Sequence, residues 1–473
     1  MRTYDELNQL NLLEYKRQGT VFSKFDYTLY PVGHRKVVTE QNGRKVEYQY
    51  DDLYRLKSET ITDPVNGDRT ISYGYDAVEN RLTNTDSVAG VTSYVYDDND
   101  RLLREELRQS GVLVGSVEYG YDNNGNTQTR TKKDAGNVVV ETVTYSWNQE
   151  NRLVGVQNSN GDAISYAYDA DGVRVGKTVN GVTTEYLVDK NLPYAQVLEE
   201  SVNDVLTASY VYGLDLISQE RGVNNSYYLV DGLGSTRGLT DASAVVTDTY
   251  SYDAFGNLIA SAGNVENNYL FAGEQLDEDL EQYYLRQRYY NPSVGRFTRV
   301  DSYEGRRSDP MSRHDYLYTH ANPVNFTDPS GLYTLGEHQA AISIINTLAE
   351  IQWASGQQLI AATLHDGDYG LKDFLTDLVW NAAFILIPPA IPYLARRAKV
   401  RPSNIPPSGA RGPVSGRDFN PDSSGGPVKK LSMSHVKITR TGIEKVKKHV
   451  SRFGYDPGND YMLKDLRLLP QEV

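Results

Sequence analysis

The sequence contains no cysteine, which excludes disulfide bonds, thiolate metal sites and a cysteine nucleophile. Its N-terminus also lacks the apolar run of a secretory signal peptide. With 39% hydrophobic residues, 23% charged residues and a mean hydropathy of −0.55, the chain fits neither a wholly disordered protein nor a polytopic membrane protein. This composition predicts a soluble chain. Its length of 473 residues predicts roughly two to four hydrophobic cores.

Tyrosine is the dominant aromatic residue, with 37 copies against 10 phenylalanines and 3 tryptophans, and glycine is also frequent with 39 copies. Tyrosine favours strands and glycine favours turns, so the composition predicts β-hairpins.

The charge is divided unevenly along the chain. The formal net charge is −14, yet residues 396–473 contain 16 Lys and Arg against 7 Asp and Glu. An acidic body with a basic tail indicates two functions, and the tail is suited to a polyanion or to the acidic part of the same chain.

One phrase recurs through the first half of the chain: an aromatic residue, any residue, a second aromatic residue, Asp or Asn, and then often Arg-Leu. Successive copies are 21 to 26 residues apart. A fixed period of this length indicates one supersecondary unit that is stacked many times. The second aromatic residues of the six copies are Tyr50, Tyr75, Tyr96, Tyr121, Trp147 and Tyr168.

Each copy has the pattern of a β-hairpin. Alternation places Val46, Tyr48 and Tyr50 on one face of a strand. Asp and Asn then supply the turn, and a second alternating segment returns. Because one hairpin is marginally stable in water, we expect successive copies to merge into a continuous sheet.

The phrase resembles the YD repeat of RHS (rearrangement hotspot) and teneurin-like proteins. The resemblance extends through the family's core motifs, which here read Tyr-Tyr-Leu-Arg-Gln-Arg-Tyr-Tyr-Asn-Pro at 283–292, Gly-Arg-Phe at 295–297 and Asp-Pro-Ser-Gly-Leu at 328–332. It implies a mainly β chain in which YD-repeat hairpins stack in a spiralling antiparallel sheet, a partial shell that encloses the polypeptide made after it. Because shells of this family are longer, it also implies a fragment of a larger effector or a short cassette.

The predicted organisation has four parts. YD repeats occupy residues 1–213, the RHS repeat-associated core occupies 214–332, a helical and hydrophobic segment occupies 333–400, and a linker with a basic, toxin-like and truncated region occupies 401–473. The last two parts form a small, mainly α extension. Within it, the uncharged run 378–395 contains three prolines, so it suits a buried helix better than a segment that crosses a membrane.

The Asp-Pro-Ser-Gly segment has two interpretations. These residues suit a type I turn that ends the sheet. The resemblance instead implies that the chain cuts itself between Leu332 and Tyr333. Hydrolysis of an amide by two carboxyl groups needs one ionised and one protonated. The candidates are Asp301 and Asp328, which match family positions, then Asp315, with Arg299 as a cation that could hold one carboxylate ionised or simply lie on the surface.

Residues 333–473 follow the position at which members of this family carry a variable toxin. The sequence there contains no His-Glu-x-x-His motif, paired cysteines or P-loop, and we expect no cofactor. His435 and His449 are the histidines of the basic tail, and either a general base for phosphodiester cleavage or a solvated side chain is compatible with their surroundings.

Two functions remain open. The first is a bacterial polymorphic toxin, secreted or delivered at a cell surface, whose partners are its own cargo, an immunity protein, secretion machinery and a nucleic acid substrate. The second is a cell-surface binding protein, without a toxin, whose tyrosine-rich structure holds a carbohydrate or a protein.

Overall fold

The computed structural model describes residues 1–192, 194–213 and 215–334. In these residues the chain forms one sheet of 24 strands and a second sheet of four strands. The first sheet consists of β1 (Arg2–Tyr4), β2 (Leu10–Arg17), β3 (Thr20–Leu29), β4 (Arg35–Glu40), β5 (Lys45–Tyr50), β6 (Leu56–Thr62), β7 (Arg69–Tyr75), β8 (Arg81–Asp86), β9 (Gly90–Tyr96), β10 (Leu102–Gln109), β11 (Val112–Tyr121), β12 (Thr127–Asp134), β13 (Val139–Trp147), β14 (Leu153–Asn158), β15 (Ala163–Tyr168), β16 (Arg174–Val179), β17 (Val182–Asp189), β18 (Gln196–Val202), β19 (Val205–Tyr212), β20 (Leu216–Arg221), β21 (Asn224–Val230), β22 (Thr236–Thr240), β23 (Val246–Tyr252) and β24 (Leu258–Ala262).

The second sheet and three short turns of 3-10 helix follow. They are β25 (Gln275–Asp277), β26 (Gln282–Leu285), β27 (Arg288–Asn291), β28 (Arg296–Phe297), η1 (Phe271–Gly273), η2 (Pro310–Arg313) and η3 (Thr319–Ala321). Within the described ranges, no helix combines the length and the apolar character needed to cross a membrane.

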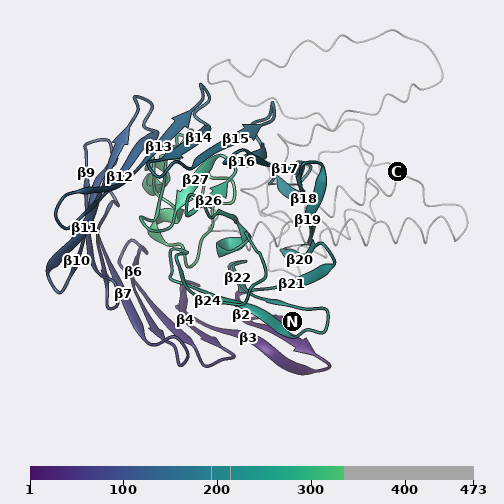
Figure 1. Cartoon of the computed structure of the whole chain (residues 1–473). Coiled ribbons are helices and arrows are strands. Elements are labelled where there is room, and N and C mark those ends of the chain that lie inside the picture. Colours follow the sequence, from purple (N-terminus) through teal and green to yellow (C-terminus); the bar gives the residue numbers. More distant parts are fainter. Residues whose placement is uncertain (193, 214, 335–473) are drawn as a thin grey trace, which may run out of the picture. The chain divides into compact units, whose positions relative to one another are not determined.

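The large sheet is an antiparallel meander in which β1 pairs with β2, β2 with β3, and so on without interruption to β24. Figure 1 shows the resulting strip as it curls from purple through blue to teal. The prediction of a mainly β chain of stacked hairpins is therefore confirmed. The predicted α extension lies outside the described residues, apart from residues 333 and 334 at its start.

The aspartate of the repeated phrase builds the turn that follows each aromatic strand. In the second copy, the Asp76 carboxylate accepts hydrogen bonds from the backbone N–H of Val78 and of Asn80 through the same oxygen. Asp97 does the same with Asn99 and Arg101. Asn148 uses its amide oxygen in the same way, so the copy that lacks Asp keeps the turn. Asx turns of this kind explain why Asp or Asn occupies the position.

The second aromatic residue of each phrase ties its hairpin to the preceding one. The hydroxyl of Tyr75 donates to the carbonyl of Leu56 at 2.9 Å, and the hydroxyl of Tyr96 donates to the carbonyl of Arg81 at 2.8 Å. In the copy with tryptophan, the indole N–H of Trp147 makes the equivalent bond. The apolar ring fills the space between strands while the polar tip is satisfied. The repeat therefore encodes both the hairpin and its connection to its neighbour.

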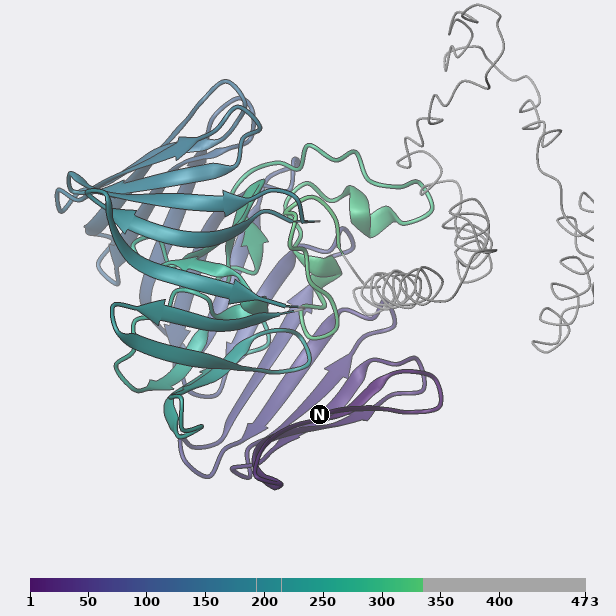
Figure 2. The same ribbon diagram turned by 90° about the vertical axis from the view of Figure 1, so that its right-hand side faces the viewer.

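The strip curls far enough for its early strands to meet its late strands. The hydroxyl of Tyr15 on β2 lies 2.9 Å from both the carbonyl and the N–H of Val230, and the hydroxyl of Tyr27 accepts a bond from Gly232. Further along this seam, Glu40 of β4 pairs with Arg237 of β22. Figure 2, turned from the first view, shows these purple and teal strands at the same end of the structure. The seam joins residues about two hundred positions apart in the chain.

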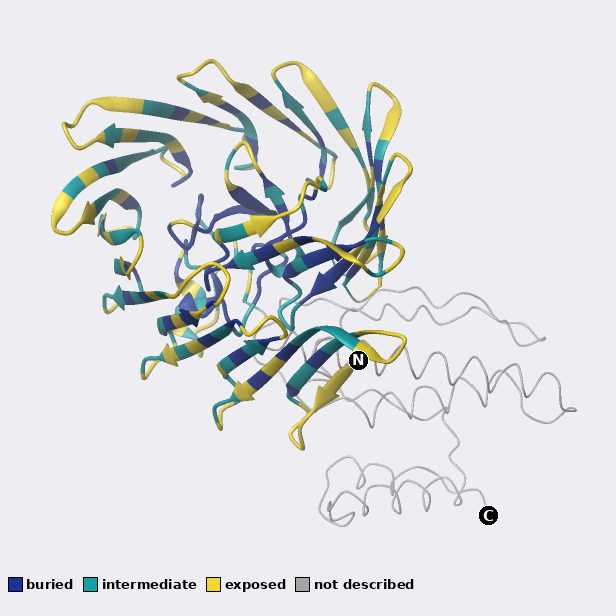
Figure 3. Ribbon diagram, turned by 60° about the horizontal axis from the view of Figure 1, so that its bottom comes forward, coloured by how far each residue is buried: buried dark blue, intermediate teal, exposed yellow. Residues whose placement is uncertain are grey.

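The segment after β24 packs against the inner side of the curled strip. Arg174 of β16 binds Asp277 of β25 and the hydroxyl of Tyr289, while Tyr316 donates to the carbonyl of Gly125. Tyr290 and Tyr318 of this segment are each at most 1% exposed. Figure 3 shows the corresponding contrast between buried inner surfaces and exposed hairpin tips. These residues, 265–334, form the inner segment, which supplies the core that a curved sheet alone would lack.

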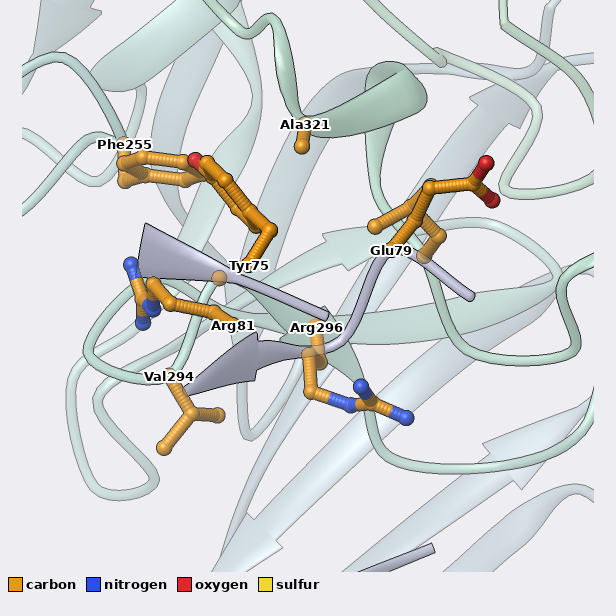
Figure 4. Close-up of a pocket in the computed structure, with 9 residues that line it drawn as sticks. Tyr75, Glu79, Arg81, Phe255, Val294, Arg296 and Ala321 are labelled. Atoms are coloured by element: carbon orange, nitrogen blue, oxygen red, sulfur yellow. The ribbon is translucent and has the colours of Figure 1, made fainter. Parts of the chain in front are cut away.

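Part of this interior is closely packed. A cavity of about 10 Å³ lies where Tyr75 and Arg81 meet Phe255 and Arg296, which is room for about one water molecule. The Arg81 guanidinium lies 4.8 Å from the centre of the Phe255 ring, and Arg296 binds the Asn80 side chain. The two guanidinium groups point away from each other (Figure 4). The cation–π contact joins early and late parts of the strip, and the bond from Arg296 to Asn80 joins the strip to the inner segment.

Glu59 is a buried carboxyl group at the seam. Its Oε1 accepts hydrogen bonds of 2.9 Å from the hydroxyl of Tyr73 and from the N–H of Ala254. Burial, and then the negative charge of Asp253, raise the pKa of Glu59 to about 8. The folded protein therefore binds a proton at Glu59 at pH values where the unfolded chain does not.

Glu59→Gln is expected to stabilise the protein progressively as the pH rises from about 5 to 8. In the wild type, folded Glu59 holds a proton that the unfolded chain has released, so the free energy of unfolding falls by up to about 1.4 kcal/mol per pH unit in this window. Glutamine keeps the acceptor oxygen and has no proton to lose. Urea unfolding at several pH values measures this difference. Exposed Glu47→Gln should follow the wild type, and parallel pH profiles for Glu59→Gln and wild type would contradict the expectation.

Candidate functional site

The loop of the β26–β27 hairpin holds the turn that ends the core. The two loop residues and the first residue of β27 bind three consecutive carbonyls of the turn. Arg286 donates to Pro329 at 2.8 Å, the N–H of Gln287 donates to Ser330 at 3.2 Å, and Arg288 donates to Gly331. These bonds to successive backbone carbonyls fix the path of the turn.

Arg288 also brings two carboxyl groups together. Its Nη2 lies 2.6 Å from Oδ2 of Asp301 and 3.6 Å from Oδ2 of Asp328. The side chains of Arg288 and Asp328 are each 2% exposed and that of Asp301 is 8% exposed. The guanidinium group also lies 3.5 Å from the centre of the Phe297 ring. Two acids that lie 27 residues apart in the sequence thus share one buried cation.

Asp328 contacts the bond that the resemblance identifies for cleavage. Its Oδ1 accepts hydrogen bonds from the N–H of Leu332 at 3.1 Å and from the N–H of Tyr333 at 3.3 Å. The same oxygen accepts a bond from the Ser330 hydroxyl. The same hydrogen bonds would cap a turn. They are therefore compatible with both the turn interpretation and the catalytic interpretation of Asp328.

The two carboxyl groups differ in their surroundings. Burial raises the pKa of Asp301 to about 6, against the opposing charge of Arg288. Burial also raises the pKa of Asp328, while Arg288 and the bonds from Ser330, Leu332 and Tyr333 act in the other direction. Raised pKa values close to neutrality are what acid–base catalysis by carboxyl groups requires.

The other residues predicted for this site lie at its edge. The Asp315 carbonyl accepts bonds from Arg288 and from the N–H of Asp301, so its backbone joins the cluster. Burial and then Asp100 raise the pKa of Asp315. Arg299 donates to the carbonyl of Gln287 at 2.8 Å. His435 and His449 lie outside the described residues.

Sequence reasoning missed three residues here: Arg288, Arg286 and Glu274. Both arginines belong to the Tyr-Tyr-Leu-Arg-Gln-Arg motif, and two cations so close to each other in an otherwise apolar run were a signal for buried acidic partners. Glu274 pairs with Arg286. Within the part of the chain that the structure describes, no group of three His, Cys, Asp or Glu side chains could hold a metal ion.

A cavity of about 130 Å³ lies beside this cluster, between the curled strip and the inner segment. Its lining includes Tyr194, Gln196 and Thr327 together with Glu274 and Arg286. Thr327 is 4% exposed, and its hydroxyl oxygen has no hydrogen-bond partner within residues 1–334 as far as the structure describes them. The cluster is therefore buried on one side and borders open space on the other.

Known proteins resemble parts of the chain. The chain is 34% identical over 195 residues to the tRNA3(Ser)-specific nuclease WapA of Bacillus spizizenii, an alignment that covers 40% of this chain and 8% of that protein. It is 24% identical over 239 residues to the double-stranded DNA deaminase toxin A of Burkholderia cenocepacia, which covers 42% of this chain and 16% of the relative. The chain thus spans less than a fifth of the length of either relative.

A crystal structure of TcdB2-TccC3-Cdc42 matches 70% of this chain and 20% of its own, at 18% identity and a TM-score of 0.40. A likeness at this level does not establish a shared fold. The family described as Teneurin YD-shell matches residues 1–324, which include the whole 24-stranded strip and most of the inner segment. This chain is therefore a member of the teneurin YD-shell family.

Proposed function

We propose that the chain is the shell-forming part of an RHS-type polymorphic toxin, that residues 333–473 are its cargo, and that the shell cuts the bond between Leu332 and Tyr333. The proposal is carried by one observation. Asp328, which shares Arg288 with Asp301, accepts a hydrogen bond from the amide nitrogen of that bond. The two acids and the bond to be cut therefore form one connected group.

The proposed reaction is hydrolysis by two carboxyl groups. Asp301, with a pKa of about 6, takes a proton from water, whose oxygen attacks the carbonyl carbon of Leu332. Asp328, whose Oδ1 lies 3.3 Å from the Tyr333 nitrogen, gives that nitrogen a proton as the carbon–nitrogen bond breaks. The products are a carboxylate at Leu332 and an amine at Tyr333. Arg288 stabilises the ionised acid and holds the Gly331 carbonyl.

The class of cargo is proposed on the names of the relatives. They include tRNA nucleases and a deaminase toxin that acts on double-stranded DNA. A cargo that acts on nucleic acid agrees with the excess of Lys and Arg over residues 396–473. Such a cargo requires a cognate immunity protein in the producing cell and a route out of it, and we propose a secreted or surface-delivered protein.

Asp328→Asn is expected to slow cleavage at least about 100-fold, because asparagine cannot donate a proton to the leaving amine. The full chain is expressed and its mass and N-terminal sequences are determined. Wild type should yield a fragment that begins at Tyr333, and Asp328→Asn should remain a single chain. Asp26→Asn, at an exposed position on β3, is the matched control and should cut normally. Wild type that remains uncut would exclude the proposed reaction.

A further inference from the structure

A second ion pair lies beside the proposed site. The Arg286 guanidinium binds the carboxylate of Glu274, the carbonyl of Pro329 at 2.8 Å and the carbonyl of Ala195 at 3.1 Å. Glu274 follows η1, Pro329 belongs to the turn, and Ala195 lies just before β18 in the curled strip. Arg286 therefore connects the turn both to the curled strip and to the rest of the inner segment.

We propose that Glu274 is a positioning residue for self-cleavage, which orients Arg286 on the Pro329 carbonyl and favours the protonated form of the neighbouring Asp328. The inference rests on the proposed function. Glu274 contacts Arg286 and is separated from the bond to be cut by the turn itself, so it acts through its neighbours.

The first part of the effect is geometric. The charge-assisted hydrogen bond from Arg286 Nη1 to Glu274 restrains the orientation of the guanidinium group. The Pro329 carbonyl accepts from the same Nη1 atom that binds Glu274. If Glu274 loses its charge, Arg286 loses the stronger of these partners. The turn then has more freedom next to Asp328, and misplacement of about 1 Å can reduce catalysis by about 100-fold.

The second part is electrostatic. Four titratable groups face Glu274: Arg286, Asp328, Tyr212 and Tyr318. Burial raises the pKa of Glu274 to about 7; Arg286 opposes this change and Asp328 adds to it. The influence is mutual, so an ionised Glu274 favours the protonated form of Asp328. That is the form which donates the proton in the proposed reaction.

Proton exchange at Glu274 has an open route. The cavity of about 130 Å³ is lined by Glu274 and Arg286 as well as by Thr327 and Pro329 of the turn. Thr327, whose buried hydroxyl oxygen has no hydrogen-bond partner among the described residues, lines the same space. Glu274 is 7% exposed, yet it borders a space large enough for several water molecules. Its charge can therefore follow the pH of the surroundings.

The test compares the pH dependence of self-cleavage. The full chain is synthesised by cell-free translation, moved to buffers between pH 5 and pH 9, and followed by the appearance of the fragment that begins at Tyr333. The wild-type rate should rise to half its maximum near pH 7, where Glu274 ionises. Glu274→Gln should lower the maximum about tenfold and move the midpoint toward pH 6, the pKa of Asp301. Glu274→Asp, which keeps a carboxylate, should recover part of the rate.

The matched control is Glu266→Gln. Glu266 pairs with Arg221 at 2.9 Å, an ion pair of the same kind as that of Glu274 with Arg286. Glu266 and Arg221 do not contact the turn, so Glu266→Gln should retain the wild-type profile. If Glu274→Gln cuts at the wild-type rate with the wild-type midpoint, the inference is wrong and the proposed function stands. If wild type itself does not cut at any pH, the proposed function is wrong. Should Glu274→Gln fail to fold, the midpoint of Glu274→Asp decides, because an unshifted midpoint near pH 7 at full rate contradicts positioning.

Discussion

Arg288→Met is expected to eliminate self-cleavage and to lower the free energy of unfolding by about 3–5 kcal/mol near pH 7.5, the usual cost of leaving a buried charge without its partner. The guanidinium group contacts Asp301, Asp328 and the Gly331 carbonyl, and all three would be left without it. Thermal or urea unfolding measures the loss of stability, and the yield of the fragment that begins at Tyr333 measures the loss of cleavage.

The pH dependence of this loss has a definite sign. Without Arg288, the pKa values of Asp301 and Asp328 rise further, so both carboxyl groups take up protons as the pH falls and the penalty shrinks. The deficit of Arg288→Met against wild type should therefore be smaller at pH 5 than at pH 8. Adding Asp301→Asn to Arg288→Met should restore part of the stability and none of the cleavage. A deficit that is equal at both pH values would exclude an electrostatic role for Arg288.

Glu40→Ala is expected to open the seam between the early and late strands. Glu40 Oε1 accepts bonds from Arg44 at 2.6 Å and from Arg237 at 2.8 Å, and its side chain is 9% exposed. Removing it leaves each buried guanidinium group with one more distant carboxylate, at 3.5 Å: Asp63 for Arg44 and Asp231 for Arg237. We therefore expect a loss of at most about 3–5 kcal/mol, the cost of a buried charge without any partner. Both arginines also hold late-strand carbonyls, those of Tyr252 and Tyr250, so their displacement should loosen the seam.

Limited proteolysis and urea unfolding measure this effect together. Glu40→Ala should be cut faster than wild type in the strands that form the seam and should unfold at lower urea concentration. The matched control is Glu47→Ala on the adjacent strand, whose exposed side chain pairs only weakly with Lys45, so a change within about 0.5 kcal/mol is expected. If both variants behave alike, the ion-pair cluster does not hold the seam.

The repeat could be predicted from the sequence because its determinants are local. Asp76 closes a turn with residues two and four positions later, and Tyr75 reaches a carbonyl 19 positions earlier. Interactions of such short range recur with the period of the sequence, so they appear in it as a pattern. Trp147 and Asn148 keep the same bonds with different atoms, which is why the degenerate copy was still recognisable.

The candidate site could be predicted only in part. Asp301 and Asp328 were selected by resemblance, and the structure brings them to one guanidinium group. Arg288 belongs to a motif that the sequence shows, but its partners lie 13 and 40 positions away in the chain. Contacts at such distances do not follow the period of the repeat, so the pattern could not predict them. Arg299 was considered as a cation of the site; it donates to the Gln287 carbonyl, and its charge opposes the rise in the pKa of Asp301.

The sequence alone determined that this chain forms antiparallel hairpins, how long each is, and that neighbours join edge to edge, because hydrogen bonds and alternation within about 25 residues decide these features. Only the tertiary structure decided where the strip meets itself and which acids share Arg288. Those outcomes depend on the small twist between successive strands, summed over a whole turn of the sheet, and on the burial of charges that must then find partners.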